Sequence, residues 1–144
     1  MSTFQSISAP IGRLFLSLIF VMSGVSKISS FAGTQAYMES AGVPGLLLPA
    51  VIALEILGGL AVILGWHTRV VAFLLAGFSL LSAILFHSNF ADQMQTIMFM
   101  KNLGLAGGFL ILVAQGAGAF SLDARFQARR SGPNPSVQPC ANRG

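Results

Sequence analysis

The sequence predicts an all-α membrane protein: a four-transmembrane-helix bundle with a short interfacial helix between the first and second spans. Of its 144 residues, 54% are hydrophobic and only 8% are charged, with a mean hydropathy of +0.78. Soluble domains carry roughly a quarter charged residues. The apolar residues also gather in four runs of about 17 to 20 residues, the length that crosses a hydrocarbon core of about 30 Å. These observations exclude a soluble globular protein.

The four apolar runs cover residues 9–28, 46–64, 70–86 and 96–114. None shows the strict alternation of polar and apolar residues that marks a transmembrane barrel strand. Backbone groups inside a bilayer must pair within their own segment, so each run is predicted to be a helix.

The connection over residues 29–45 is the longest and is predicted to contain a helix at the membrane surface. Ser30 offers an N-cap, Phe31 and Tyr37 can share an apolar edge, and Gly42 followed by Pro44 is a stop signal. The next connection, residues 65–69, is tight and contains Trp66, whose amphipathic ring suits the interface. The second and third spans are therefore predicted to form an antiparallel hairpin.

Basic residues are distributed unequally between the two predicted faces. Two lysines, Lys27 and Lys101, fall on one face, and six arginines fall on the face of the two termini: Arg13, Arg69, Arg125, Arg129, Arg130 and Arg143. The positive-inside rule then predicts a multi-pass protein of the bacterial inner (plasma) membrane with both termini in the cytoplasm. The net charge is +4, but the basic residues form no stripe with interleaved aromatics. Nucleic-acid binding is therefore excluded, and the bilayer is the expected partner.

Residues 1–125 are predicted to form one domain, and residues 126–144, rich in Pro, Ser and Asn, a disordered basic tail. The only cysteine, Cys140, lies in that tail, which excludes an internal disulfide or dithiol site. His67 and His87 are predicted at opposite membrane faces, so they cannot share a metal ion or one haem. No nucleophile with an adjacent base, GxGxxG motif or P-loop occurs, and no catalytic residue is identified.

Glu55 is the one acidic residue inside a predicted span, about nine residues and so roughly 13 Å from its outer end. An ionisable group at that depth is costly unless it is paired or protonated, which makes it a candidate for function. Lys101 lies at a similar depth once the length of its side chain is counted, so we expect it to pair with Glu55, with Lys27 as the second choice. The alternative is an ion pair that only holds helices together.

Other polar groups are predicted at the same outer end. Lys27 closes the first run, His87 closes the third, and Asn102 follows Lys101. Together with Glu55 they represent all four spans, which predicts a polar pocket in the outer half of the bundle. The alternatives are a boundary histidine, a lysine that extends to the interface and an asparagine that hydrogen-bonds between helices.

Small residues one turn apart are expected to let helices approach closely. The glycines assigned to helix packing are Gly58, Gly59, Gly104, Gly107 and Gly108.

Six phrases follow one another in a fixed order: FAGTQAYMESAGVPG (31–45), LEILGG (54–59), TR (68–69), FHSNFA (86–91), MFMKNL (98–103) and SLD (121–123). Together, over about residues 10–125, they resemble the DoxX family, and in particular its small YqjF-like inner-membrane branch. The resemblance implies a four-helix membrane protein associated with membrane oxidoreduction, since relatives include part of a thiosulfate:quinone oxidoreductase. Family membership alone does not name a reaction.

Three functions are therefore considered. The first is a redox-linked membrane module, a subunit or accessory of a membrane oxidoreductase rather than a self-contained enzyme, which binds quinone or docks a redox partner through the outer polar pocket. A diffusible quinone is then the expected cofactor, because none intrinsic to the chain is indicated. The second is a non-catalytic membrane scaffold or integrity protein. The third is a small carrier or proton-coupled transporter, which would have to be a homo-oligomer because four short helices leave little room for alternating access.

Overall fold

The structure, a computed structural model, describes residues 3–130, and this part of the chain is helical and contains no β-strand. Its helices and helical turns are α1 (Thr3–Ser29), α2 (Phe31–Ser40), the 3₁₀ turn η1 (Gly45–Leu47), α3 (Leu48–Ala53), the π-helical turn η2 (Leu54–Gly58), α4 (Gly59–Leu64), α5 (Thr68–Phe86), α6 (Gln93–Gln115) and α7 (Leu122–Arg130).

Four segments are long and apolar enough to cross a membrane: Ile7–Ser29, Gly45–Leu64, Thr68–Phe86 and Gln93–Gln115. The second, called span 2 below, is a continuous rod made of η1, α3, η2 and α4. Each segment coincides closely with one of the predicted apolar runs. The predicted fold class, an all-α bundle with four transmembrane helices, is therefore confirmed.

The helix predicted between the first two spans is present as α2. It begins one residue after α1 and ends at Ser40. Gly42 then adopts a φ of +78°, and Pro44 precedes η1. Because a residue with a Cβ is strained at positive φ, glycine suits this turn, and the predicted stop signal is the observed one.

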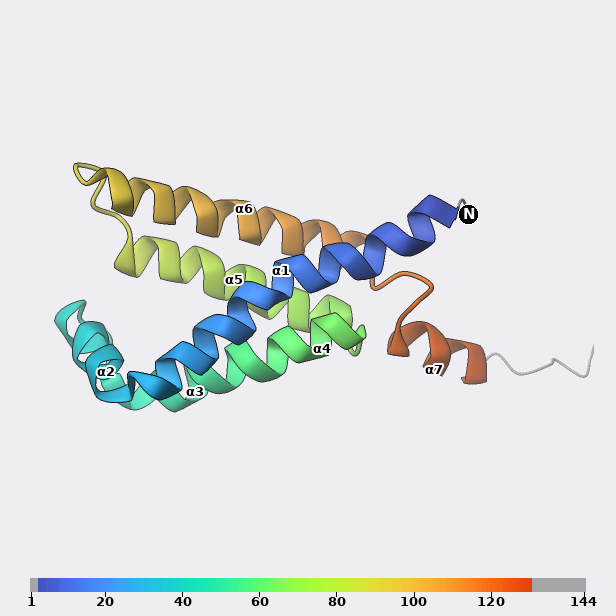
Figure 1. The fold of residues 1–144 in the computed structure, drawn as a ribbon, viewed down its shortest axis with the longest axis horizontal. Coiled ribbons are helices and arrows are strands. Elements are labelled where there is room, and N and C mark those ends of the chain that lie inside the picture. Colours follow the sequence, from blue (N-terminus) through green and yellow to red (C-terminus); the bar gives the residue numbers. More distant parts are fainter. Residues whose placement is uncertain (1–2, 131–144) are drawn as a thin grey trace, which may run out of the picture.

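The bundle has two ends that differ in what they hold. The N-terminus, the turn at Gly65 and α7 lie at one end, called the clamp end; α2 and the turn between α5 and α6 lie at the other, called the cavity end (Figure 1). α5 packs along α6, and α1 packs along span 2. These two pairs of helices spread apart toward the cavity end (Figure 1).

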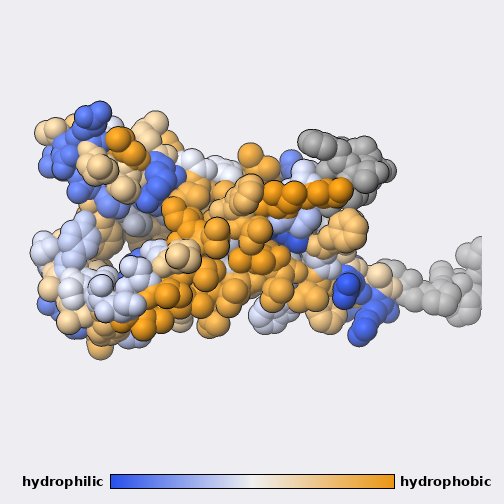
Figure 2. All heavy atoms as spheres, in the orientation of Figure 1, coloured by the Kyte–Doolittle hydropathy of each residue, from blue (hydrophilic) through white to orange (hydrophobic). Residues whose placement is uncertain are grey.

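The surface of the bundle has the polarity expected of a membrane protein. Figure 2 shows apolar residues over the middle of the visible face and hydrophilic residues at both ends. Exposed large side chains on all four spans, among them Phe15, Leu57, Phe73 and Ile111, are more than half exposed. Lipid can solvate such side chains and water cannot, so the exposed apolar band fits a bilayer.

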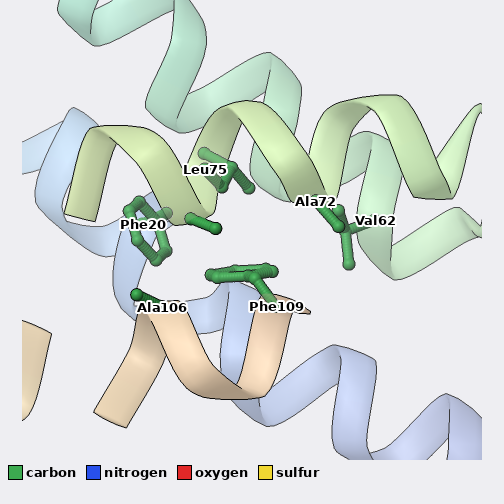
Figure 3. Close-up of a cluster of buried hydrophobic side chains, with 7 residues drawn as sticks. Phe20, Val62, Ala72, Leu75, Ala106 and Phe109 are labelled. Carbon is green, nitrogen blue, oxygen red and sulfur yellow. The ribbon is translucent and has the colours of Figure 1, made fainter. Parts of the chain in front are cut away.

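A cluster of buried side chains joins all four spans near the middle of the bundle (Figure 3). Phe20 of α1, Val62 of α4, Leu75 of α5 and Phe109 of α6 belong to it. The rings of Phe20 and Phe109 meet edge to face, with their centroids 5.4 Å apart. Inside a bilayer burial from water drives little helix association, so these van der Waals contacts hold the spans together.

The five glycines predicted to mediate packing divide into two groups. A Cβ added to Gly58 would lie 3.4 Å from Leu75, one on Gly59 2.8 Å from Val21, and one on Gly108 2.7 Å from Leu16. These three glycines therefore allow neighbouring side chains to approach the helix closely. A Cβ on Gly104 or Gly107 would meet nothing within 4 Å. The prediction is wrong for these two within the described chain, because α6 packs through the face of its buried residues Asn102, Ala106 and Phe109 instead.

The boundary drawn at residue 125 falls inside a helix. α7 runs from Leu122 to Arg130, so the first five residues of the predicted tail are helical. Ser121 Oγ accepts a hydrogen bond from Ala124 N at 3.1 Å and caps this helix. The remainder of the predicted tail, residues 131–144, lies outside the described residues.

Candidate functional site: a polar cavity between the two pairs of helices

A cavity of about 330 Å³ lies at the cavity end, bounded by α1, α2, span 2, α5 and α6. Its walls are mainly apolar. All five side chains assigned to the predicted polar pocket line it: Lys27, Glu55, His87, Lys101 and Asn102. The fold therefore brings these residues to one cavity, while their role in binding stays a prediction.

The cavity wall carries a part-buried ion pair between α1 and span 2. Lys27 Nζ donates to both carboxylate oxygens of Glu55, at 2.8 Å to Oε1 and 2.9 Å to Oε2. Ser23 Oγ accepts from Lys27 Nζ at 2.6 Å and donates to Glu55 Oε1 at 3.2 Å. The Glu55 side chain is only 4% exposed and that of Lys27 24%. Each charge is thus compensated where an isolated one would be costly.

Glu55 lies in the π-helical turn η2. A π turn is wider than an α turn and frequently occurs at functional sites. The turn η2 lies against Gly24 of α1. A Cβ added to Gly24 would be 2.5 Å from Ile56 Cγ1 and 3.3 Å from Glu55 Cβ. The missing side chain at Gly24 therefore lets α1 approach the wide turn, which brings Lys27 within reach of Glu55.

The prediction that Lys101 pairs with Glu55 is wrong, and the second choice, Lys27, is the partner. Span 2 packs against α1, whereas α6 packs mainly against α5. Equal depth in the membrane therefore does not bring Lys101 to Glu55. Lys101 Nζ instead donates to Met98 Sδ on its own helix, at 3.3 Å.

The two other predicted site residues are held by partners close to them in sequence. The amide of Asn102 donates to Met98 O at 3.1 Å, so this amide bonds within α6 and not between helices. His87 directly follows α5, and its Nδ1 lies 2.7 Å from Gln95 Oε1 of α6. The histidine thus ties the end of α5 to the start of α6 at the rim of the cavity.

Tyr37 of α2 also lines the cavity and was not among the predicted site residues. Its ring stacks on Phe86 with centroids 5.5 Å apart, and its hydroxyl donates to Phe86 O at 3.5 Å. These contacts hold α2 against the end of α5. The position of Tyr37 on the apolar edge of the predicted helix indicated that α2 contacts the bundle. It did not indicate which helix α2 contacts.

A second polar network, at the clamp end, was also missed. Arg13 of α1 is only 3% exposed, and it donates from Nη1 to Ala117 O at 2.8 Å and from Nη2 to Phe120 O at 2.6 Å. Arg13 was counted among the surface arginines, and nothing in the sequence indicated that its side chain is buried. The guanidinium fixes the segment between α6 and α7 against α1.

Asp123 of α7 completes the clamp end. Its Oδ1 and Oδ2 accept from the backbone N–H groups of His67 and Thr68, at 2.8 and 2.9 Å, which caps the start of α5. Asp123 N donates in turn to Gly65 O at 2.9 Å. Burial alone would raise the pKa of the Asp123 carboxyl, but the hydrogen bonds from Thr68 and His67 outweigh it and lower that pKa.

Chemically, the cavity combines apolar walls with a hydrogen-bonded Lys–Glu pair, a histidine and Lys101, which forms no ion pair within residues 3–130. Such a set can bind an apolar molecule through its polar atoms and exchange protons with it. His67 and His87 lie at opposite ends of α5. Residues 3–130 contain no group of three His, Cys, Asp or Glu side chains that could hold a metal ion.

Comparisons with known proteins agree with this description. The DoxX family model matches residues 9–88. The chain is similar to Inner membrane protein YqjF of Escherichia coli (strain K12), with 49% identity over 123 residues, 85% of this chain and 95% of YqjF. It is 38% identical to Inner membrane protein YphA of the same organism, over 80% of this chain and 87% of YphA.

A more distant relative is CatD of Bacillus subtilis (strain 168), whose name assigns it provisionally to the oxidoreductases. It is 34% identical over 73 residues, 51% of this chain and 54% of CatD. No solved structure matches the chain. From the family match over residues 9–88 and the two inner-membrane relatives, the chain is an integral inner-membrane protein and belongs to the DoxX family.

Proposed function

We propose that the chain is a redox-linked membrane module that binds a lipid-soluble quinone in the cavity described above. The observation that carries the proposal is the Lys27–Glu55 pair, with a buried carboxylate, in the wall of an otherwise mainly apolar cavity. A quinone headgroup is a flat apolar ring with carbonyl oxygens, so it needs apolar walls and one or two hydrogen-bond donors. The volume of about 330 Å³ is of the size that small-molecule sites have.

The pair also supports a role in proton exchange. Reduction of a quinone to a quinol takes up two electrons and two protons, and Lys27, Glu55 and His87 are groups at the cavity that can carry protons. The electrons would come from a redox protein docked on the module. The distant similarity to the oxidoreductase-named CatD agrees with that class of partner.

The proposal includes an orientation: the cavity end faces away from the cytoplasm, and both termini lie in the cytoplasm. It rests on the excess of arginines at the clamp end. In a background without Cys140, a single cysteine at position 67 should be labelled only from the cytoplasmic side. Labelling from the opposite side would reverse the orientation.

The binding proposal is tested by purifying the protein from native membrane in mild detergent and analysing the organic extract by mass spectrometry. Near-stoichiometric quinone is expected in the wild type. The double substitution of Lys27→Met with Glu55→Gln, which leaves no unpaired charge, should retain the fold and lose the quinone. Glu39→Gln, which removes an exposed carboxylate of α2, is the control and should keep it.

A scaffold role is the second candidate, favoured by the fact that the Lys27–Glu55 pair ties α1 to span 2. On that hypothesis the pair only stabilises the bundle. Phospholipid as the sole extracted lipid, together with no binding of added quinone, would support the scaffold and contradict the quinone site.

A further inference from the structure

We propose that Lys101 makes the cavity selective for a ligand with an oxyanion headgroup on an apolar chain. The inference deepens the quinone proposal and rests on it, because it concerns the same cavity and specifies the charge of the ligand. It follows from the charges, hydrogen bonds and exposure of the residues around the cavity.

The charges of the cavity do not balance. Three charged side chains line it, Lys27, Glu55 and Lys101. Lys27 and Glu55 neutralise each other at 2.8 Å. In the described part of the chain Lys101 has no carboxylate partner, so the cavity carries one uncompensated positive charge.

Lys101 also has hydrogen-bonding capacity left over. An ammonium group has three donors, and the contact that Lys101 Nζ makes is to Met98 Sδ, a weak acceptor. The other ionisable or amide groups of the cavity already have oxygen or nitrogen partners: Lys27 with Glu55, His87 with Gln95, the Asn102 amide with Met98 O, and the Tyr37 hydroxyl with Phe86 O. Within residues 3–130, Lys101 is therefore the charged donor of the cavity that has no oxygen acceptor as its partner.

Lys101 lies inside the fourth span, on an exposed side of α6 that borders the cavity. It lies eight residues beyond Gln93, where α6 begins, and so about 12 Å along the helix. A lysine there is costly without a counter-charge, and an oxyanion in the cavity would supply one.

The apolar walls of the cavity suit the chain of such a ligand. Leu47, Leu81 and Leu85 line the cavity and are also 49%, 55% and 41% exposed on the apolar surface. A ligand chain can follow them from the bilayer, while its headgroup reaches Lys101. The same chemistry fits an ionised hydroxyl on a quinone ring or the carboxylate of a fatty acid.

The test measures the affinities of two matched pairs of probes for the protein in lipid nanodiscs at neutral pH. One pair is a 2-hydroxy-3-alkyl-1,4-naphthoquinone, ionised at this pH, and its neutral 2-methoxy analogue. The other is a fatty acid and the fatty alcohol of the same chain length. We expect the wild type to prefer at least one acidic member about tenfold, the size of one charge-assisted hydrogen bond.

Variants of Lys101 decide whether the preference comes from this residue. Lys101→Met should show a ratio near one within each pair, whatever its affinity for the neutral quinone. Lys101→Arg, which keeps the charge, should retain the preference, and so should Arg69→Met, which removes an exposed cation at the clamp end. Preference in the quinone pair assigns a ring oxyanion, and preference in the fatty pair assigns a carboxylate.

Two results would overturn the inference. Equal affinities within both pairs in the wild type, or a preference that survives in Lys101→Met, would show that Lys101 does not select an anion, and the quinone site itself would stand. If neither the neutral nor the acidic quinone binds the wild type, the quinone proposal and this inference both fail.

Discussion

The two ends of the bundle bury charge in opposite ways. At the clamp end, Arg13 and Asp123 bond to main-chain groups, the guanidinium to carbonyl oxygens and the carboxylate to N–H groups. At the cavity end, Lys27 and Glu55 bond to each other. Main-chain partners do not titrate and cannot be replaced by substitution, whereas side-chain partners can be exchanged or protonated.

The contrast separates a structural region from a reactive one. The clamp end fixes where α1, α5 and α7 meet, while the helices spread apart at the cavity end (Figure 1). Polar side chains line the cavity there. Substitutions at the clamp end should therefore affect stability alone. Those at the cavity end should affect binding as well.

The largest loss of stability is expected from Arg13→Met. It would leave the buried carbonyl of Ala117 and the part-buried carbonyl of Phe120 without their donor, a cost of about 4 kcal/mol. Thermal unfolding in detergent measures it. Arg69→Met removes an exposed arginine from the same end and should cost less than about 0.5 kcal/mol. Equal effects of the two substitutions would refute the clamp.

A smaller loss, about 3 kcal/mol, is expected from Lys27→Met, because Glu55 then remains buried without its partner. Adding Glu55→Gln removes the stranded charge, so the double variant should be more stable than Lys27→Met. A double-mutant cycle of unfolding free energies tests this. Strictly additive losses would mean that the pair contributes nothing to stability as a pair.

Asp123→Asn should cost about 1 kcal/mol, since an amide keeps one of the two acceptor oxygens that cap α5. The effect should depend on pH. The pKa of Asp123 is lowered below its ordinary value of 3.8, so its stabilisation is present above that value and is lost as pH falls through the folded-state pKa.

Melting temperatures of the wild type and Asp123→Asn should therefore differ at neutral pH and converge below about pH 4. A difference that stays constant on acidification would show that the carboxylate is not the stabilising form.

The smallest effect is expected where neither end is involved. Gly107→Ala should stabilise α6 by about 0.5 kcal/mol, because alanine favours a helix and the position has open space around it. Gly59→Ala should instead destabilise, because its Cβ would lie 2.8 Å from Val21 Cγ2. Loss of stability in Gly107→Ala would indicate a partner at this face.

The four spans and α2 could be predicted from the sequence because run length, Gly42 and Pro44 are local signals. The set of residues at the cavity was also accessible, since depth along each helix follows from counting residues. Their pairing was not. Depth does not indicate which way a side chain points around the helix or which helices are neighbours. In addition, the π turn at Glu55 changes the direction in which the following side chains of span 2 point.

The clamp end was beyond sequence reasoning for a different reason. Arg13 and its acceptor Ala117 are 104 residues apart, and the acceptors are carbonyl groups that every residue carries. No residue type marks such a partner. Arg13 therefore looked like one more arginine at the cytoplasmic surface.

The chain contains one tryptophan and one tyrosine, and the fold sets them at opposite ends. Trp66 is half exposed in the turn beside the clamp, next to His67, and Tyr37 stacks on Phe86 at the cavity. The protein thus has one natural fluorophore at each end. Tyrosine emission would report movement of α2, and tryptophan emission the state of the clamp, without any added label.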